Sequence, residues 1–223
     1  MTDIIFITPN NHSVTYQGLA SAGLSAVEPP TWALLLSESM RSKGYNVAMV
    51  DTLAEALSDE QLEVRVQKLQ SRILCFVVYG QNVNAGTTSM GGAVRQAAHL
   101  KSKMPNSPIV LIGSHVQALP CETLEKEPSL DIVVLNEGVK AIEALLALES
   151  LEKESLKAVP GIMFRSNGEV FSGRVPLSLN QEALESELPG YAWDLLPYKS
   201  KPLDLYRSPT WHADYIDEFR TPY

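Results

Sequence analysis

The sequence has few of the residues that mark several classes of protein. Its 223 residues include only two cysteines, Cys75 and Cys121, so neither a disulfide framework nor a four-thiolate metal site is expected. The 18 Lys and Arg residues are outnumbered by 26 Asp and Glu, and the formal net charge of -8 argues against a nucleic-acid-binding surface. No apolar run is long enough to span a bilayer, and the first residues lack a signal-peptide pattern. We therefore expect a cytoplasmic, globular protein that neither enters a membrane nor binds nucleic acid.

The sequence motifs of common catalytic and cofactor sites are also missing. The chain has no GxGxxG dinucleotide motif, no GxxxxGKS/T phosphate loop and no GxSxG nucleophile elbow. Its four histidines are scattered and show no metal-ligand spacing. The residues therefore indicate a binding domain, with no catalytic constellation of its own.

The first 150 residues alternate the apolar patterns of strands and helices. Predicted strands cover 4–8, 46–50, 73–79, 108–112 and 131–135, and the last two predicted helices cover about 88–104 and 139–148. Pro30 favours the start of a first helix, Gly44 its end, and Ser58 with Gln61 forms a capping box that starts a second. Short connections between such units imply right-handed crossovers. We expect a doubly wound, flavodoxin-like α/β domain with a parallel five-stranded sheet in the order 2-1-3-4-5.

The pattern changes after about residue 150. Residues 161–165 and 169–172 have the composition of two strands, and Asn167-Gly168 between them is a strong hairpin signal. The remainder is rich in proline and aromatic residues and has no periodicity. We predict three parts: a ligand-binding domain in 1–150, a hairpin and linker in 151–190, and a tail in 191–223.

Ligands of doubly wound sheets bind beyond the carboxyl ends of the strands, so the loops at those ends are the candidate sites. The loop 79–88 is polar and precedes a helix whose free N–H groups suit an anionic or amide-rich ligand. Gly113 and Ser114 leave room for a flat ligand, while His115 either binds a ligand or packs. Glu137 either caps the next helix or binds a ligand hydroxyl.

Five passages occur in a fixed order: PPTWAL at 29–34, PIVLIGSHVQALP at 108–120, DIVVLNEG at 131–138, VPGIMFRSNG at 159–168 and LPGYAWDLL at 188–196. Together they resemble the N-terminal cobalamin-binding region of the cobalamin-dependent radical S-adenosylmethionine enzymes, which include anaerobic magnesium-protoporphyrin ester cyclases and methyltransferases. The resemblance covers nearly the whole chain and implies that cobalamin is the ligand. The cofactor-binding positions that it implies are Pro30, Thr31, Tyr79, Gly80, Gln81, Asn82, Gly113, Ser114, His115, Leu119, Pro120, Asn136, Glu137 and Gly138.

The chain departs from one cobalamin pattern and lacks one part of the family. Nothing between Pro9 and Thr31 fits the DxHxxG motif that supplies a histidine to cobalt in methionine-synthase-type domains, so we expect cobalamin bound base-off with no metal-ligating side chain. The family's CxxxCxxC iron–sulfur motif, which serves S-adenosylmethionine chemistry, does not occur here. The resemblance therefore implies a non-catalytic part of a radical methyltransferase or cyclase, with residues 191–223 leading to the radical domain.

Three alternatives remain open from the residues alone. A stand-alone cobalamin sensor or carrier would not need the proline- and tryptophan-rich extension. A flavodoxin-like domain for a flavin or another small ligand would need a phosphate-binding loop after the first strand, and residues 10–13 are a poor candidate for one. A doubly wound domain that has lost its ligand would serve assembly.

Overall fold

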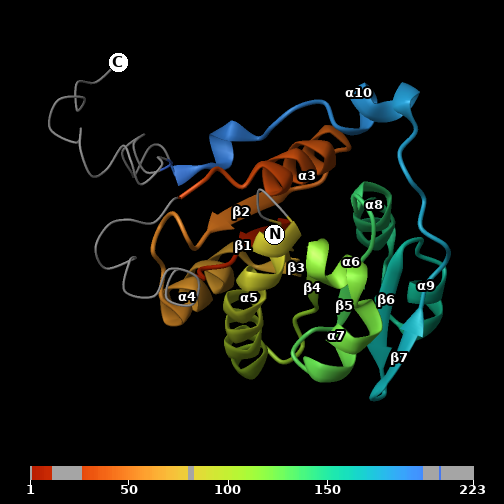
Figure 1. Ribbon diagram of the computed structural model, residues 1–223, viewed down its shortest axis with the longest axis horizontal. Coiled ribbons are helices and arrows are strands. Elements are labelled where there is room, and N and C mark those ends of the chain that lie inside the picture. The colour runs from red at the N-terminus through yellow and green to blue at the C-terminus, as the bar shows by residue number, and fades with distance from the viewer. Residues whose placement is uncertain (1, 12–26, 80–82, 198–205, 207–223) are drawn as a thin grey trace, which may run out of the picture.

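A seven-stranded sheet in the order β2-β1-β3-β4-β5-β6-β7 forms the centre of the molecule (Figure 1). The computed structural model describes residues 2–11, 27–79, 83–197 and 206. The strands are β1 (Thr2–Thr8), β2 (Val47–Asp51), β3 (Ser71–Val78), β4 (Ile109–Gly113), β5 (Ile132–Val134), β6 (Ile162–Ser166) and β7 (Glu169–Ser172). β1 to β5 are parallel and follow the predicted order 2-1-3-4-5, which confirms the doubly wound fold.

Helices cover both faces of the sheet (Figure 1). One face carries α3 (Thr31–Ser42) and α8 (Val139–Ala147), and the other carries α4 (Asp59–Leu69), α5 (Val83–Lys103) and α7 (Pro120–Lys126). Along β1, Ile4 and Phe6 pack on the first face, whereas Ile5 and Ile7 pack on the second. Burial on both faces explains why the strands are continuous apolar runs in the sequence.

Local sequence signals mark both ends of α3 (Thr31–Ser42) and the start of α4 (Asp59–Leu69). α3 begins after Pro30, and Gly44 follows its last turn with a left-handed φ of 90°. At α4 the Ser58 side chain accepts from the Gln61 N–H at 3.2 Å, and the Gln61 side chain accepts from the Ser58 N–H at 2.9 Å, so the predicted capping box is confirmed. Two helices differ from expectation. α5 begins at Val83, five residues earlier than predicted, and Ser114–Ala118 form the short helix α6 where a loop was expected. No proline interrupts either stretch.

The hairpin formed by β6 and β7 extends the sheet. Its turn has left-handed φ angles of 51° at Asn167 and 83° at Gly168, as a two-residue hairpin loop requires. α9 (Lys153–Lys157) leads into β6, which pairs antiparallel with β5 and places Phe164 opposite Ile132. Phe164 is fully buried in the same hydrophobic core as α3 and α8. The hairpin was predicted, but its place at the edge of this sheet was not.

Residues 174–196, here called the strap, cross α8 and α3 and return the chain to the β2 side of the sheet (Figure 1). The strap contains the short helical segments Gln181–Ala183, α10 (Leu184–Glu187) and Trp193–Leu195. The Ala192 N–H donates to the Leu34 carbonyl at 3.2 Å, and Leu196 is also buried. Both terminal nitrogens of Arg41 bind the Asp194 carboxylate, at 2.7 and 3.0 Å. A stretch without sequence periodicity is therefore docked on the domain.

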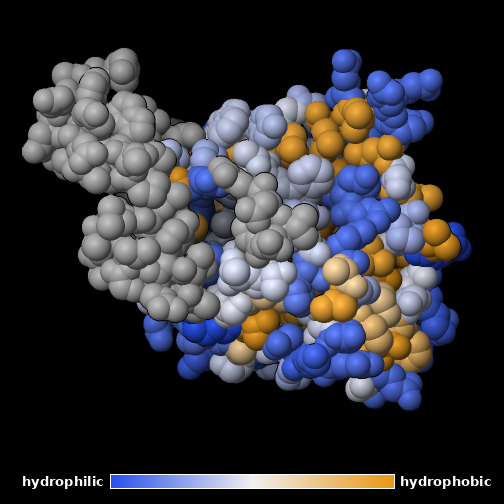
Figure 2. All heavy atoms as spheres, viewed as in Figure 1, coloured by the Kyte–Doolittle hydropathy of each residue, from blue (hydrophilic) through white to orange (hydrophobic). Residues whose placement is uncertain are grey.

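The surface of the molecule is mixed in polarity (Figure 2). Hydrophobic residues lie near α3 and at several other places on the face shown, between hydrophilic ones (Figure 2). In the strap, the exposed large hydrophobic side chains include Leu184, Tyr191 and Trp193. Within the described part of the chain, no helix has the length and apolar character needed to cross a membrane.

Candidate functional site

The carboxyl ends of the parallel strands meet at one edge of the sheet. The registers pair Thr8 with Asp51 and Val78 with Gly113, so neighbouring strands end at the same level. The chain that leaves β3, β4 and β5 therefore converges there. Tyr79, helix α6 and the turn 136–138 are the segments that meet.

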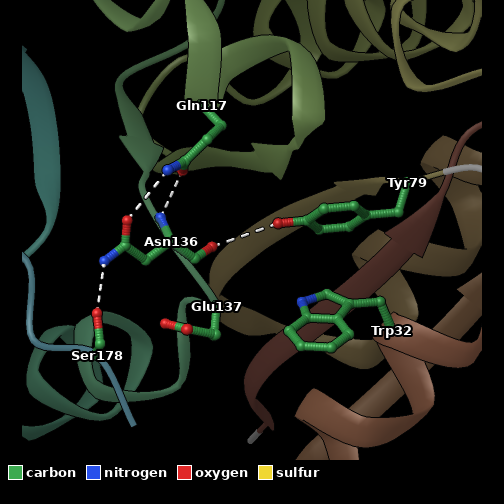
Figure 3. A pocket seen from close by; sticks show the side chains of 6 residues that line it. All are labelled: Trp32, Tyr79, Gln117, Asn136, Glu137 and Ser178. Atoms are coloured by element: carbon green, nitrogen blue, oxygen red, sulfur yellow. Dashed lines mark hydrogen bonds between the residues drawn. The ribbon is translucent and has the colours of Figure 1, made fainter. Parts of the chain in front are cut away.

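Asn136 connects these segments by hydrogen bonds (Figure 3). Its N–H donates to Gln117 Oε1 at 2.5 Å, and Gln117 Nε2 donates back to Asn136 Oδ1 at 3.0 Å. Its Nδ2 donates to Ser178 Oγ in the strap at 3.3 Å. The backbone at Asn136 is left-handed, with φ 53°, a conformation that asparagine adopts more readily than most residues. The turn is thus tied to α6 on one side and to the strap on the other.

Trp32 and Tyr79 form an aromatic wall opposite this turn (Figure 3). Their ring centroids are 5.6 Å apart with an interplanar angle of 57°. The Tyr79 hydroxyl donates to the Asn136 carbonyl at 3.3 Å. Burial, with a smaller contribution from the negative charge of Glu137, raises the pKa of Tyr79 to about 12. The hydroxyl therefore stays protonated at neutral pH and serves as a donor.

An open pocket of about 390 Å³ lies between the wall and the turn. It is lined by Trp32, Tyr79, Gln117, Asn136, Glu137 and Ser178. Gly138 is the N-cap residue of α8, no side chain caps this end of the helix, and Glu137 makes no hydrogen bond to the described residues of α8. Instead the Glu137 side chain lies at the pocket (Figure 3). The pocket thus combines a flat apolar wall with amide, hydroxyl and carboxylate groups.

Two glycines near the end of β4 lie in close contact with neighbouring protein segments. A Cβ added to Gly113 would overlap the Val78 carbonyl oxygen and lie 2.9 Å from its carbon. A Cβ added to Gly86 in α5 would overlap Ser114 Oγ. At both glycines, the space that a side chain would occupy is thus filled by protein atoms. Next to them, His115 Nδ1 lies 3.4 Å from Thr87 Oγ1.

A second polar group occupies the ends of β1 and β2. Asp51 is buried and accepts a hydrogen bond from the Tyr206 hydroxyl at 2.9 Å. Burial raises the pKa of Asp51 to about 6, and its hydrogen bonds oppose that effect. Gln96 is also fully buried, and its Oε1 accepts from the Thr52 hydroxyl at 3.2 Å. Gln96 Nε2 has no hydrogen-bond partner among the described residues.

The structure brings part of the predicted site together. Tyr79, Asn136 and Glu137 line the pocket, and Gly138 completes the turn. The other described positions lie along the same series of loops. Pro30 and Thr31 begin α3, Gly113 ends β4, Ser114 and His115 begin α6, and Leu119 and Pro120 join α6 to α7. Gly80, Gln81 and Asn82 lie outside the described residues.

Three pocket residues were not identified from the sequence. Trp32 was assigned to the apolar face of its helix, and its indole Nε1 is buried without a hydrogen-bond partner among the described residues. Gln117 lies within the passage 108–120 that carries the family resemblance, but no sequence pattern distinguishes it from its neighbours. Ser178 lies in the strap, where the sequence has no pattern to interpret. All three reach the site through tertiary packing.

The lining groups suit a ligand with flat apolar surfaces and amide-like polar groups. Indole and phenol rings pack against apolar surface, while amide and carboxylate oxygens accept hydrogen bonds. In the described residues, no three His, Cys, Asp or Glu side chains are grouped to hold a metal ion. A ligand with flat apolar surface and amides at its rim fits the groups that line the pocket.

Comparison with known sequences gives one family and several relatives. The B12 binding domain family matches residues 21–146. An anaerobic magnesium-protoporphyrin IX monomethyl ester cyclase of Cereibacter sphaeroides is 24% identical over 172 residues, which cover 76% of this chain and 26% of the cyclase. The cobalamin-dependent radical SAM methyltransferase TokK of Streptomyces tokunonensis is 32% identical over 80 residues, 36% of this chain and 12% of TokK. The chain thus spans about a quarter of the length of the Cereibacter cyclase.

Solved structures share the fold. The cobalamin-dependent S-adenosylmethionine radical enzyme OxsB, with aqua-cobalamin and S-adenosylmethionine bound, has a TM-score of 0.62 and 16% sequence identity. That match covers 87% of this chain and 24% of OxsB. The radical S-adenosylmethionine methyltransferase TsrM from Kitasatospora setae has a TM-score of 0.56 and 15% identity, over 78% of this chain and 30% of TsrM. At these identities the likeness concerns the fold.

Proposed function

Because the chain belongs to the B12 binding domain family, we propose that it holds cobalamin at the carboxyl edge of its sheet, within a cobalamin-dependent radical S-adenosylmethionine enzyme. The observation that carries this proposal is the open pocket formed where β3, β4 and β5 end; of its lining residues, all but Ser178 lie in the stretch that the family matches. Cobalamin is wide and its rim is lined with amides. The pocket offers a matching combination of aromatic surface and hydrogen-bonding groups.

The residues have separate tasks in this proposal. Trp32 and Tyr79 supply apolar surface, and the Tyr79 hydroxyl, protonated at neutral pH, keeps the Asn136 turn in place. Asn136 holds α6 and the strap in fixed positions around the ligand. Bound cobalamin would supply the cobalt-centred chemistry, while the protein contributes orientation and surroundings. The loop positions Pro30, Thr31, Gly80 to Asn82, Gly113 to His115, Leu119, Pro120 and Gly138 are proposed to contact it as well.

We further propose that cobalamin is bound base-off. The stretch between Pro9 and Thr31 has no DxHxxG motif, and His115, the histidine nearest to β4, faces Thr87 through Nδ1. The lower position of cobalt would then carry no protein histidine. A His115→Ala variant is expected to bind with the same spectrum.

Residues 191–223 are proposed to lead to the domain that carries the radical chemistry. The support is the share of each relative that the chain covers, which is 26% for the Cereibacter cyclase and 24% for OxsB. In this arrangement the present chain positions the corrinoid, and the iron–sulfur cluster and S-adenosylmethionine belong to the other domain. Methyl transfer and ring formation are the two reaction types that the relatives' names offer.

Cobalamin binding is tested directly by mixing the chain with hydroxocobalamin, removing the excess on a desalting column and recording the absorption spectrum. We expect one retained cobalamin per chain with a base-off spectrum. A base-on or histidine-ligated spectrum would refute the base-off proposal. A folded chain that retains no cobalamin would refute the proposed function.

A further inference from the structure

Glu137 stands out among the polar side chains that line the pocket. Gln117 and Ser178 each hydrogen-bond to Asn136, and the Tyr79 hydroxyl donates to the Asn136 carbonyl (Figure 3). The carboxylate of Glu137 makes no hydrogen bond or ion pair with any residue that the structure describes. The nearest cation along the chain, Lys140, is bound by Glu143 and Glu187 instead. The pocket therefore contains an acceptor that is still available to a ligand.

The backbone on both sides holds Glu137 in place. Asn136 and Gly138 have left-handed φ angles of 53° and 79°, and the turn is held by the hydrogen bonds of Asn136 to Gln117 and Ser178. A Cβ at Gly138 would overlap Ile112 Cδ1 and lie 3.2 Å from Val134 Cγ1, which shows how closely the turn packs on the sheet. The backbone that carries Glu137 is therefore already in place beside the pocket before a ligand binds.

The surroundings favour neutral N–H donors over anions. An ionised carboxylate can only accept hydrogen bonds. Its charge adds to the burial that raises the pKa of Tyr79, so the same charge would oppose any negative group brought into the pocket. The aromatic wall opposite, Trp32 with Tyr79, takes apolar surface. A primary amide carried on an apolar ring matches these requirements, and a carboxylate on the same ring does not.

We propose that Glu137 accepts the N–H groups of a primary amide at the corrin rim and thereby selects amidated corrinoids over those whose side chains are carboxylates. This inference rests on the proposed function, because it assigns a task to one residue within that site. Glu137 thus serves as a specificity determinant, distinct from any group that acts on cobalt.

The test compares two corrinoids that both lack the nucleotide, dicyanocobinamide with amide side chains and dicyanocobyrinic acid with carboxylates. Dissociation constants are measured by equilibrium dialysis for the unchanged chain, Glu137→Gln and Glu149→Gln. Glu149 is an exposed carboxylate beyond the opposite end of α8, so its variant controls for the loss of one negative charge. Hydroxocobalamin retention by the unchanged chain is measured in parallel.

The unchanged chain is expected to bind dicyanocobinamide more tightly than dicyanocobyrinic acid, and the ratio of the two dissociation constants measures this preference. Glu137→Gln should reduce that ratio about tenfold, because a hydrogen bond to a charged acceptor is usually stronger than one to a neutral acceptor by about that factor. Glu149→Gln should leave the preference unchanged. If hydroxocobalamin is retained but Glu137→Gln and Glu149→Gln have the same preference, the inference is overturned and the proposed function stands. If the unchanged chain retains no hydroxocobalamin, both are overturned. Glu137→Ala, which removes the acceptor altogether, provides a second variant should Glu137→Gln misfold, and it should reduce the preference at least as much.

Discussion

The glycine that ends β4 should be among the most sensitive positions in the chain. Gly113 lies beside the Val78 carbonyl, and a methyl group there would overlap that oxygen. The oxygen belongs to the backbone of β3, which is paired in register with β4 and cannot turn aside. We expect Gly113→Ala to lower the free energy of unfolding by about 3 kcal/mol, the upper end of the usual cost of overpacking. For a chain of this size the melting temperature should fall by about 6–12 °C.

Gly86 provides a matched comparison because the obstacle there is a side chain. A methyl group at Gly86 would overlap Ser114 Oγ, which can rotate or be removed. Gly86→Ala should cost about 1 kcal/mol, and the Gly86→Ala/Ser114→Ala double variant should recover part of it beyond the effect of Ser114→Ala alone. The free energies of unfolding of the unchanged chain, the two single variants and the double variant are measured by urea unfolding followed by circular dichroism.

The stability of Gly113→Ala also shows why a glycine occupies position 113. If the free energy of unfolding of Gly113→Ala differs by less than about 0.5 kcal/mol from that of the unchanged chain, the close approach of β3 and β4 is refuted. If that stable variant also loses hydroxocobalamin, the space at Gly113 serves the ligand, as the sequence first suggested. Loss of stability without rescue by any side-chain change would confirm the packing role.

Two further predictions concern charged groups. Because burial raises the pKa of Asp51 to about 6, above its unfolded value of about 3.9, the folded state binds this proton more tightly. Stability should therefore rise as the pH falls from 7 to 4, by about 2 kcal/mol from this group. Asp51→Asn should remove that part of the pH dependence when urea unfolding is measured at several pH values. Lys43 Nζ lies 2.7 Å from Glu143 and 2.5 Å from Glu187, which fastens α10 to α3 and α8. Lys43→Met should lower stability by about 1 kcal/mol at low salt and by less in 1 M NaCl, and an equal loss at both salt concentrations would contradict an ionic contribution.

The parallel part of the fold could be predicted because its strands and most of its helices are encoded locally, α6 being the exception. Continuous apolar runs marked β3 and β4, Ser58 with Gln61 marked the start of α4, and the alternation of the elements implied the sheet order. The hairpin was equally clear from Asn167-Gly168. Its attachment to β5 was not, because the pairing of Ile132 with Phe164 joins segments that no local signal relates.

The residues of the pocket could likewise be predicted only where a local signal marks them. Asn136 and Glu137 were identified because they follow a predicted strand at the edge where ligands bind. Trp32 was taken for a core residue, since helical spacing cannot tell a side chain that packs inward from one at the rim of a pocket. Ser178 reaches the site only because the strap crosses the domain, and the strap depends on contacts such as Ala192 with Leu34.

The strap also has a consequence for synthesis on the ribosome. The part of α3 that it covers is made early, whereas Ala192 and Leu196, which are buried against the core containing α3, emerge after every strand of the sheet. At roughly 5–20 residues per second, the two segments appear on the order of ten seconds apart. During that interval this apolar surface is open to other proteins in the cell. A chain cut before Ala192 would keep it open permanently, so shortened versions of this domain should aggregate even though all seven strands are present.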